Sequence, residues 1–175
     1  MQSVVQFAIS SLIANLNSLT NFFSQFGSFC PYYPCLCCNN FFNAIGTELA
    51  KMPNTFNNNA EFFCMDISSI RFLPDGRHDF ANSPWNNIRD KSGILIIFDR
   101  NVGQILRVSA STILYDYGQR FETDNTHTLL EGVDISNCSV FFLCLTTTLG
   151  NAPSNKTLNV LRNALIAVLK PTHNK

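Results

Sequence analysis

The sequence has no surplus of basic residues and few charged residues of either sign. Lys plus Arg and Asp plus Glu number 12 each, so the formal net charge is zero, and charged residues make up 14% of the 175 residues. Nucleic-acid-binding proteins usually carry a basic surplus, because Lys and Arg side chains neutralise phosphates. Tight DNA binding by the chain as a whole is therefore not expected, although a local basic patch is compatible with this balance.

Long hydrophobic runs are also lacking. Asn, Ser and Gln interrupt the most apolar stretches well before 18 residues, so no transmembrane segment is predicted. The N-terminus lacks the basic cluster that opens a secretory signal. Seven cysteines are an odd number for a disulfide framework. We therefore expect a cytoplasmic protein with reduced thiols.

Motifs for nucleotide, esterase and zinc chemistry are missing. No G-x4-G-K-[ST], G-x-G-x-x-G, G-x-S-x-G or H-E-x-x-H string occurs. The four N-terminal cysteines have the spacing C-x4-C-x-C-C, which differs from the paired C-x2-C of zinc sites. A zinc or iron–sulfur site and lipidation both stay open, but packing as small hydrophobic residues is favoured. These residues are Cys30, Cys35, Cys37 and Cys38.

The composition that is present predicts a folded chain with one main domain and an extension. Hydrophobic residues make up 46%, and 16 of them are Phe. Apolar residues in the stretch 3–26 recur at spacings of three and four, which predicts an amphipathic helix, and a second helix is predicted at 39–52. Residues 1–52 are thus a helical Cys- and Phe-rich extension, expected to dock on the domain at 61–175 or on a partner, or to form an oligomer.

The second half of the chain shows the pattern of a small α+β domain. Residues 61–87 contain Pro-Asp-Gly turn chemistry and predict an ordered lead-in with little regular structure. We expect an α/β fold of the α+β type, in which a three-stranded antiparallel sheet is flanked by helices and preceded by the helical extension. Its predicted elements are a hairpin of strands at 94–98 and 104–108, a strand at 139–145 and a helix at 156–169.

Several strings in this order resemble the GIY-YIG endonuclease family. In that family Gly-Ile-Tyr opens the first strand and Leu-Tyr-Val/Ile-Gly ends the second. A Glu in the C-terminal part is separated by two residues from Leu-Ile, and Pro and a final Asn follow. The spacing survives here over about half the chain. The matching text is Gly93-Ile94-Leu95, Leu106-Arg107-Val108-Ser109, Arg162-Asn163-Ala164-Leu165-Ile166, Pro171 and Asn174.

The resemblance also implies what has been lost. The family uses tyrosine to help activate water, a helical arginine to stabilise phosphoryl charge and a glutamate to hold a divalent metal. Here Leu95 and Arg107 replace tyrosines, and Arg162 replaces the glutamate. Arg120 is the candidate for the helical arginine, at a longer spacing than the family has. We therefore expect a nuclease-like protein without catalytic activity, which acts as an interaction module for a protein or a nucleic acid.

Two rival functions stay open at this point. One is an active, metal-dependent DNA endonuclease that binds Mg²⁺ through Asp99, Asp116 or Glu122, and only this reading calls for a cofactor. The other is a metalloprotein built on the cysteine cluster. Arg107 is either a solvated strand residue or, together with Arg162, a contact for phosphate or carboxylate. Cys138 and Cys144 are interpreted as buried strand residues rather than nucleophiles.

Overall fold

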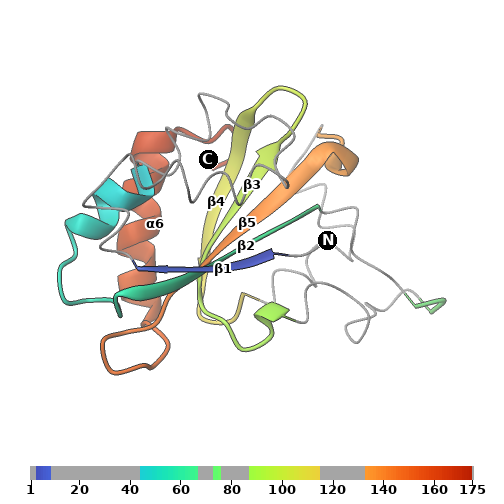
Figure 1. The fold of residues 1–175 in the computed structure, drawn as a ribbon. Coiled ribbons are helices and arrows are strands. Elements are labelled where there is room, and N and C mark those ends of the chain that lie inside the picture. The colour runs from blue at the N-terminus through green and yellow to red at the C-terminus, as the bar shows by residue number, and fades with distance from the viewer. Residues whose placement is uncertain (1–2, 9–43, 67–72, 76–86, 115–132, 175) are drawn as a thin grey trace.

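The sheet of this protein has five strands, all antiparallel to their neighbours, in the order β1-β2-β5-β3-β4 (Figure 1). The computed structural model describes residues 3–8, 44–66, 73–75, 87–114 and 133–174. A short helix occupies 44–50, and a single 3₁₀ turn spans Ile135–Asn137. The named elements are β1 (Ser3–Ala8), β2 (Asn59–Asp66), β3 (Gly93–Asp99), β4 (Gln104–Ser111), β5 (Cys138–Cys144) and α6 (Asn155–Leu169).

The predicted hairpin, third strand and C-terminal helix are confirmed, and so is the α+β class. β3 and β4 pair through a turn in which Gly103 has a positive φ of 66° and donates its N–H to the Asp99 carbonyl at 2.9 Å. Glycine suits this position because a side chain disfavours positive φ. β5 pairs with β3 along its whole length, so residues distant in sequence form the centre of the sheet.

Three predictions about the sheet and the N-terminal half were wrong. The sheet has five strands instead of three, and residues 3–8 form strand β1 instead of the start of a helix. The first six residues of the 61–87 lead-in, 61–66, belong to β2, an inner strand. Phe62 and Phe63 point to opposite faces, and both are buried. A strand covered on both faces shows an unbroken apolar run rather than alternation, and this short run was therefore easy to miss.

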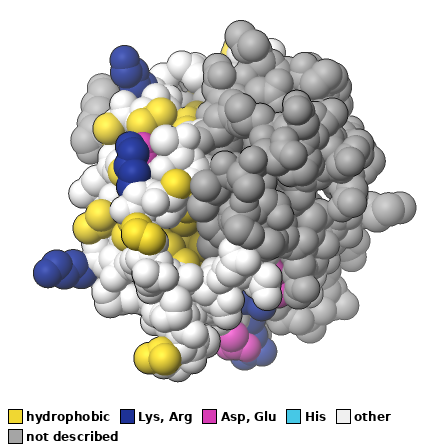
Figure 2. All heavy atoms as spheres, turned by 60° about the vertical axis from the view of Figure 1, so that its left-hand side comes forward, with side chains coloured by type: hydrophobic (Ala, Val, Ile, Leu, Met, Phe, Trp, Pro, Cys, Tyr) yellow, Lys and Arg dark blue, Asp and Glu magenta, His cyan; other side chains and the backbone are white. Residues whose placement is uncertain are grey.

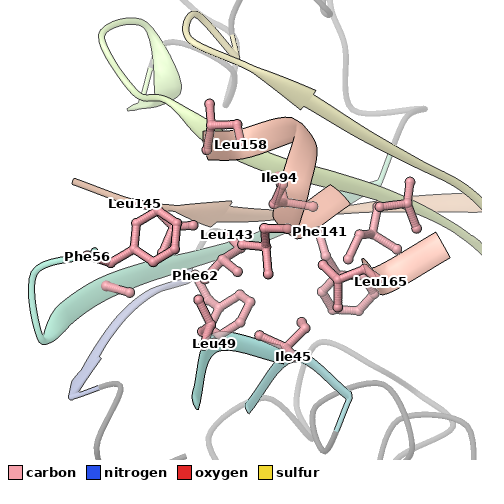
Figure 3. Close-up of a cluster of buried hydrophobic side chains, with 14 of the residues drawn as sticks. Ile45, Leu49, Phe56, Phe62, Ile94, Phe141, Leu143, Leu145, Leu158 and Leu165 are labelled. Carbon is pink, nitrogen blue, oxygen red and sulfur yellow. The ribbon is translucent and has the colours of Figure 1, made fainter. Parts of the chain in front are cut away.

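The two faces of the sheet carry separate hydrophobic clusters. On one face α6 and the 44–50 helix pack against side chains from β2, β3, β4 and β5, and Figure 3 shows Ile45, Leu49 and Leu165 turned toward Phe62 and Leu143. Helix 44–50 belongs to the predicted 39–52 helix, and it lies in the same core as the strands. The remainder of the predicted extension, residues 9–43, lies outside the described residues. The proposed division at 52 and 61 stays a prediction.

The opposite face is covered differently. Its cluster contains Leu95, Ile97 and Leu106 from the hairpin, with Ile88 and Leu114 from the flanking segments. Both clusters are dominated by side chains with almost no exposed surface. Burial of apolar surface on this scale is the main stabilising contribution to such a fold.

The ends of α6 determine where the last residues of the chain lie. Ser154 caps the start, its hydroxyl accepting the Thr157 N–H at 3.1 Å. At the other end Lys170 adopts a left-handed conformation with φ 49°, and its N–H donates to the Ile166 carbonyl at 2.9 Å. Pro171 follows and prevents the helix from continuing. The chain therefore leaves α6 in a turn and returns along the sheet.

Candidate functional site

The C-terminal tail, residues 171–174, runs along the outer edge of β4, the last strand of the sheet. The Thr172 N–H donates to the Ile105 carbonyl at 3.4 Å, and the His173 N–H donates to the Leu106 carbonyl at 2.8 Å. Because both sequences advance in the same direction, the tail lies parallel to β4. It lies where a further strand would pair with β4.

Asn174 completes this pairing with its side chain. Its Nδ2 donates to the Val108 carbonyl at 2.7 Å, and its Oδ1 accepts the Val108 N–H. A carboxamide has the same donor and acceptor as a peptide group, so one side chain satisfies both main-chain groups of Val108. The final Asn of the family resemblance thus has a structural role at a strand edge.

Two arginines hold the same region together. Arg107 donates from Nη1 to the His173 carbonyl at 3.1 Å and from Nε to the Ser109 hydroxyl at 3.2 Å. Arg162, on α6, donates from Nε to the Val108 carbonyl at 3.4 Å and from Nη1 to Asn163 Oδ1 at 3.4 Å. The structure therefore brings four predicted positions together, and we call Arg107, Ser109, Arg162 and Asn174 the β4-edge site.

The other predicted positions of the resemblance are buried, closely packed or outside the described residues. Leu95 pairs across the hairpin with Ser109, but it is 0% exposed and belongs to the cluster on the face opposite α6. Gly93 begins β3, two residues before Leu95, and has φ 152°. A Cβ added there would come within 1.9 Å of the Leu143 carbonyl oxygen. Its glycine is explained by this close strand packing. Arg120 lies outside the described residues.

The donor set of the β4-edge site does not fit Mg²⁺. This metal prefers carboxylate, carbonyl and water oxygens. β4 and α6 contain no Asp or Glu, and the side chain where the family has its glutamate is the cation Arg162. Across the described part of the chain, no group of three or more potential metal-binding side chains is found. We therefore derive no chemical step through a metal at this site.

Of the three acidic residues that the endonuclease alternative would use, the structure describes Asp99. Asp99 ends β3, and its Oδ1 accepts the N–H groups of Asn101 and Val102 at 2.8 and 3.4 Å, which stabilises the hairpin turn. Asp116 and Glu122 lie outside the described residues, as do the four N-terminal cysteines. Neither the endonuclease alternative nor the cysteine-cluster alternative is therefore tested by the described geometry.

The two cysteines of β5 are buried thiols, as predicted. Burial, with a smaller contribution from Asp99, raises the pKa of Cys138 to about 11. Burial and the nearby Glu61 raise the pKa of Cys144 well above its usual range, although Lys91 acts in the opposite direction. Both thiols are protonated at neutral pH and are poor nucleophiles in that form.

A polar pocket at the ends of β2, β3 and β5 was not predicted from the sequence. It has a volume of about 330 Å³, and its walls include Asn57, Asn59, Asp90 and the ion pair between Lys91 and Glu61 at 2.6 Å. Strand pairing between β2 and β5 creates it, so no local motif could have revealed it. Its walls would suit a small polar molecule better than an apolar one.

Comparisons of this chain with protein-family models, curated proteins and solved structures found no significant match. The nuclease-like assignment accordingly stays a prediction from the sequence. Within the described residues, no helix is long and apolar enough to span a membrane.

Proposed function

We propose that this chain is a nuclease-like protein without nuclease activity, which acts as an interaction module for a protein or a nucleic acid. The observation that carries this proposal is the use of the β4-edge arginines. Arg107 and Arg162 stand where the family resemblance expects a tyrosine and a glutamate, and both donate to main-chain carbonyls of β4 or the tail. Side chains engaged in this way support the strand edge and supply neither a base nor a metal ligand.

Leu95, whose side chain lies on the face of the sheet away from α6, supports the same conclusion. An alkyl side chain has no proton to exchange, and this one is fully buried among Ile97, Leu106 and their neighbours. A tyrosine at position 95 would point away from α6, which carries Arg162. Three replacements together should abolish cleavage, since an acid–base group contributes about a hundredfold or more by itself. The cytoplasmic location also stays a prediction.

The test is a cleavage assay with purified protein, supercoiled plasmid and either Mg²⁺ or Mn²⁺. We expect no cleavage above that of an Arg162→Ala variant purified in parallel, which controls for a contaminating nuclease. Metal-dependent cleavage that changes with this substitution would contradict the proposal. Asp99→Asn is the second variant, because loss of activity in it alone would favour the endonuclease that uses Asp99.

A further inference from the structure

The outer edge of β4 is occupied by the tail, which is a segment of only four residues. An edge strand exposes main-chain N–H and C=O groups that readily pair with another extended chain. The main-chain hydrogen bonds of the tail to this edge include one from Thr172 that is long, at 3.4 Å. Asn174 supplies side-chain groups where a true strand would supply main-chain groups.

The basic residues around the β4 edge would also attract an acidic segment more strongly than they attract the tail. β4, α6 and residues 170–175 contain five Lys and Arg residues and no Asp or Glu, although the whole chain has equal numbers of both signs. Lys170 and Lys175 flank the tail in the sequence, so the tail brings no acidic side chain to Arg107 and Arg162. In Figure 2, which brings the α6 side forward, the few acidic side chains that are visible lie beside basic ones. The five are Arg107, Lys156, Arg162, Lys170 and Lys175.

We propose that the β4 edge docks an acidic, extended peptide segment of a protein partner, which pairs with β4 as an added strand and displaces the tail. The carboxylates of such a segment would meet Arg107 and Arg162, and its main chain would pair with the edge groups of Leu106 and Val108. A nucleic acid could satisfy the arginines but has no peptide groups for the strand edge. The protein partner is therefore favoured. This inference deepens the proposed function by naming its surface and its kind of partner.

The tail makes docking of the partner segment competitive. An attached segment acts at a high effective concentration, so it lowers the apparent affinity for any free peptide. Replacing Asn174 with Ala removes two hydrogen bonds from the tail and none from within β4. Since these two partly exposed hydrogen bonds together contribute about 1–2 kcal/mol net, the variant should bind the peptide roughly tenfold more tightly.

The experiment uses the full chain and a fluorescein-labelled (Thr-Glu)₅ peptide, with binding followed by fluorescence anisotropy at low ionic strength. The control probe is the same peptide methylated on every main-chain nitrogen, which keeps its charge but cannot donate to an edge strand. We expect the unmethylated peptide to bind at least about tenfold more tightly than its methylated form, in line with the loss of several hydrogen bonds.

Two matched variants separate local charge from general charge. Arg162→Gln should weaken binding severalfold, because this guanidinium contacts Val108 at the edge. Lys156→Gln makes the same change in charge on the same helix and should alter binding by less than about twofold. Equal effects of the two variants would mean that binding depends on the overall charge of the protein and not on contact with the β4 edge.

Three further outcomes would overturn the docking proposal. These are equal binding of the methylated and unmethylated peptides, no binding of (Thr-Glu)₅ even to the Asn174→Ala variant, and displacement of the peptide by a single-stranded oligothymidylate that binds more tightly. Failure here leaves the lack of nuclease activity untouched. Plasmid cleavage would overturn the proposed function without affecting peptide binding.

Discussion

The centre of the sheet and its β4 edge are built from different kinds of residues. β3 and β5 pair over seven residues each, and almost every side chain in them is buried and uncharged. β4 alternates between core residues and the polar pair Arg107 and Ser109, and among the described residues it is the tail that covers its outer side. The centre is specified by continuous burial and the edge by single polar contacts. Stability should therefore depend on the first and binding on the second.

The largest effect in this comparison is expected from deleting residues 1–52. The deletion removes β1 from the edge of β2 and removes Ile45 and Leu49 from the core around Phe62. Each of the two lost core side chains should cost about 2–5 kcal/mol, which together approach the whole stability of an ordinary domain. We expect insoluble protein. A soluble truncation with an unchanged thermal midpoint would show that the centre of the sheet does not need this segment.

Gly93→Ala tests the tight packing of β3 against β5. The new Cβ would meet the Leu143 carbonyl oxygen at 1.9 Å, so the two central strands must separate locally. We expect the free energy of unfolding in urea to fall by about 3 kcal/mol. Gly150→Ala is the matched control, because that glycine also has a positive φ but has nothing within 4 Å of the added atom. Equal losses in the two variants would refute the steric explanation.

Replacing the polar residues at the β4 edge should cost less. Asn174→Ala and Arg107→Ala each remove hydrogen bonds that join the tail to β4, and the tail is partly exposed to solvent. We expect each variant to lose about 1 kcal/mol of unfolding free energy. A loss as large as that of Gly93→Ala would mean that the edge is as important to stability as the centre.

The last effect, which appears only at high pH, concerns the pKa of Cys138. Its pKa is raised to about 11 by burial, so the folded state favours the neutral thiol. The resulting stability is complete below the unfolded pKa near 9 and is lost as the pH rises toward 11. The loss should be about 1–2 kcal/mol. Cys138→Ala should show a correspondingly flatter decline in urea unfolding above pH 9, and an unchanged slope would show that this thiol does not contribute.

The sequence predicted those parts of the fold that local patterns encode. The hairpin has a Gly-containing turn between two apolar runs, and α6 shows an apolar stripe that ends before Pro171. β1 and β2 were missed because their positions depend on pairing with β5 and with each other, which no local pattern reveals. Valines in β1 fit a strand as well as an amphipathic helix when the stretch is short.

The sequence also predicted part of the candidate site. The resemblance identified Arg107, Arg162 and Asn174 as positions that belong together, and the structure places them around Val108. It could not indicate that Leu95 is buried on the face of the sheet away from α6, because the family pattern gives spacing but no environment. The polar pocket depends wholly on tertiary pairing and left no signal in the sequence.

The most direct test of the β4-edge site is amide hydrogen exchange at Val108. Its N–H donates to the Asn174 side chain, which is its acceptor within the described part of the chain, so the tail should protect it. In the Asn174→Ala variant we predict that exchange at Val108 becomes at least about tenfold faster, while the amides between β3 and β5 exchange as before. Unchanged protection at Val108 in this variant would contradict the claim that the tail closes the edge.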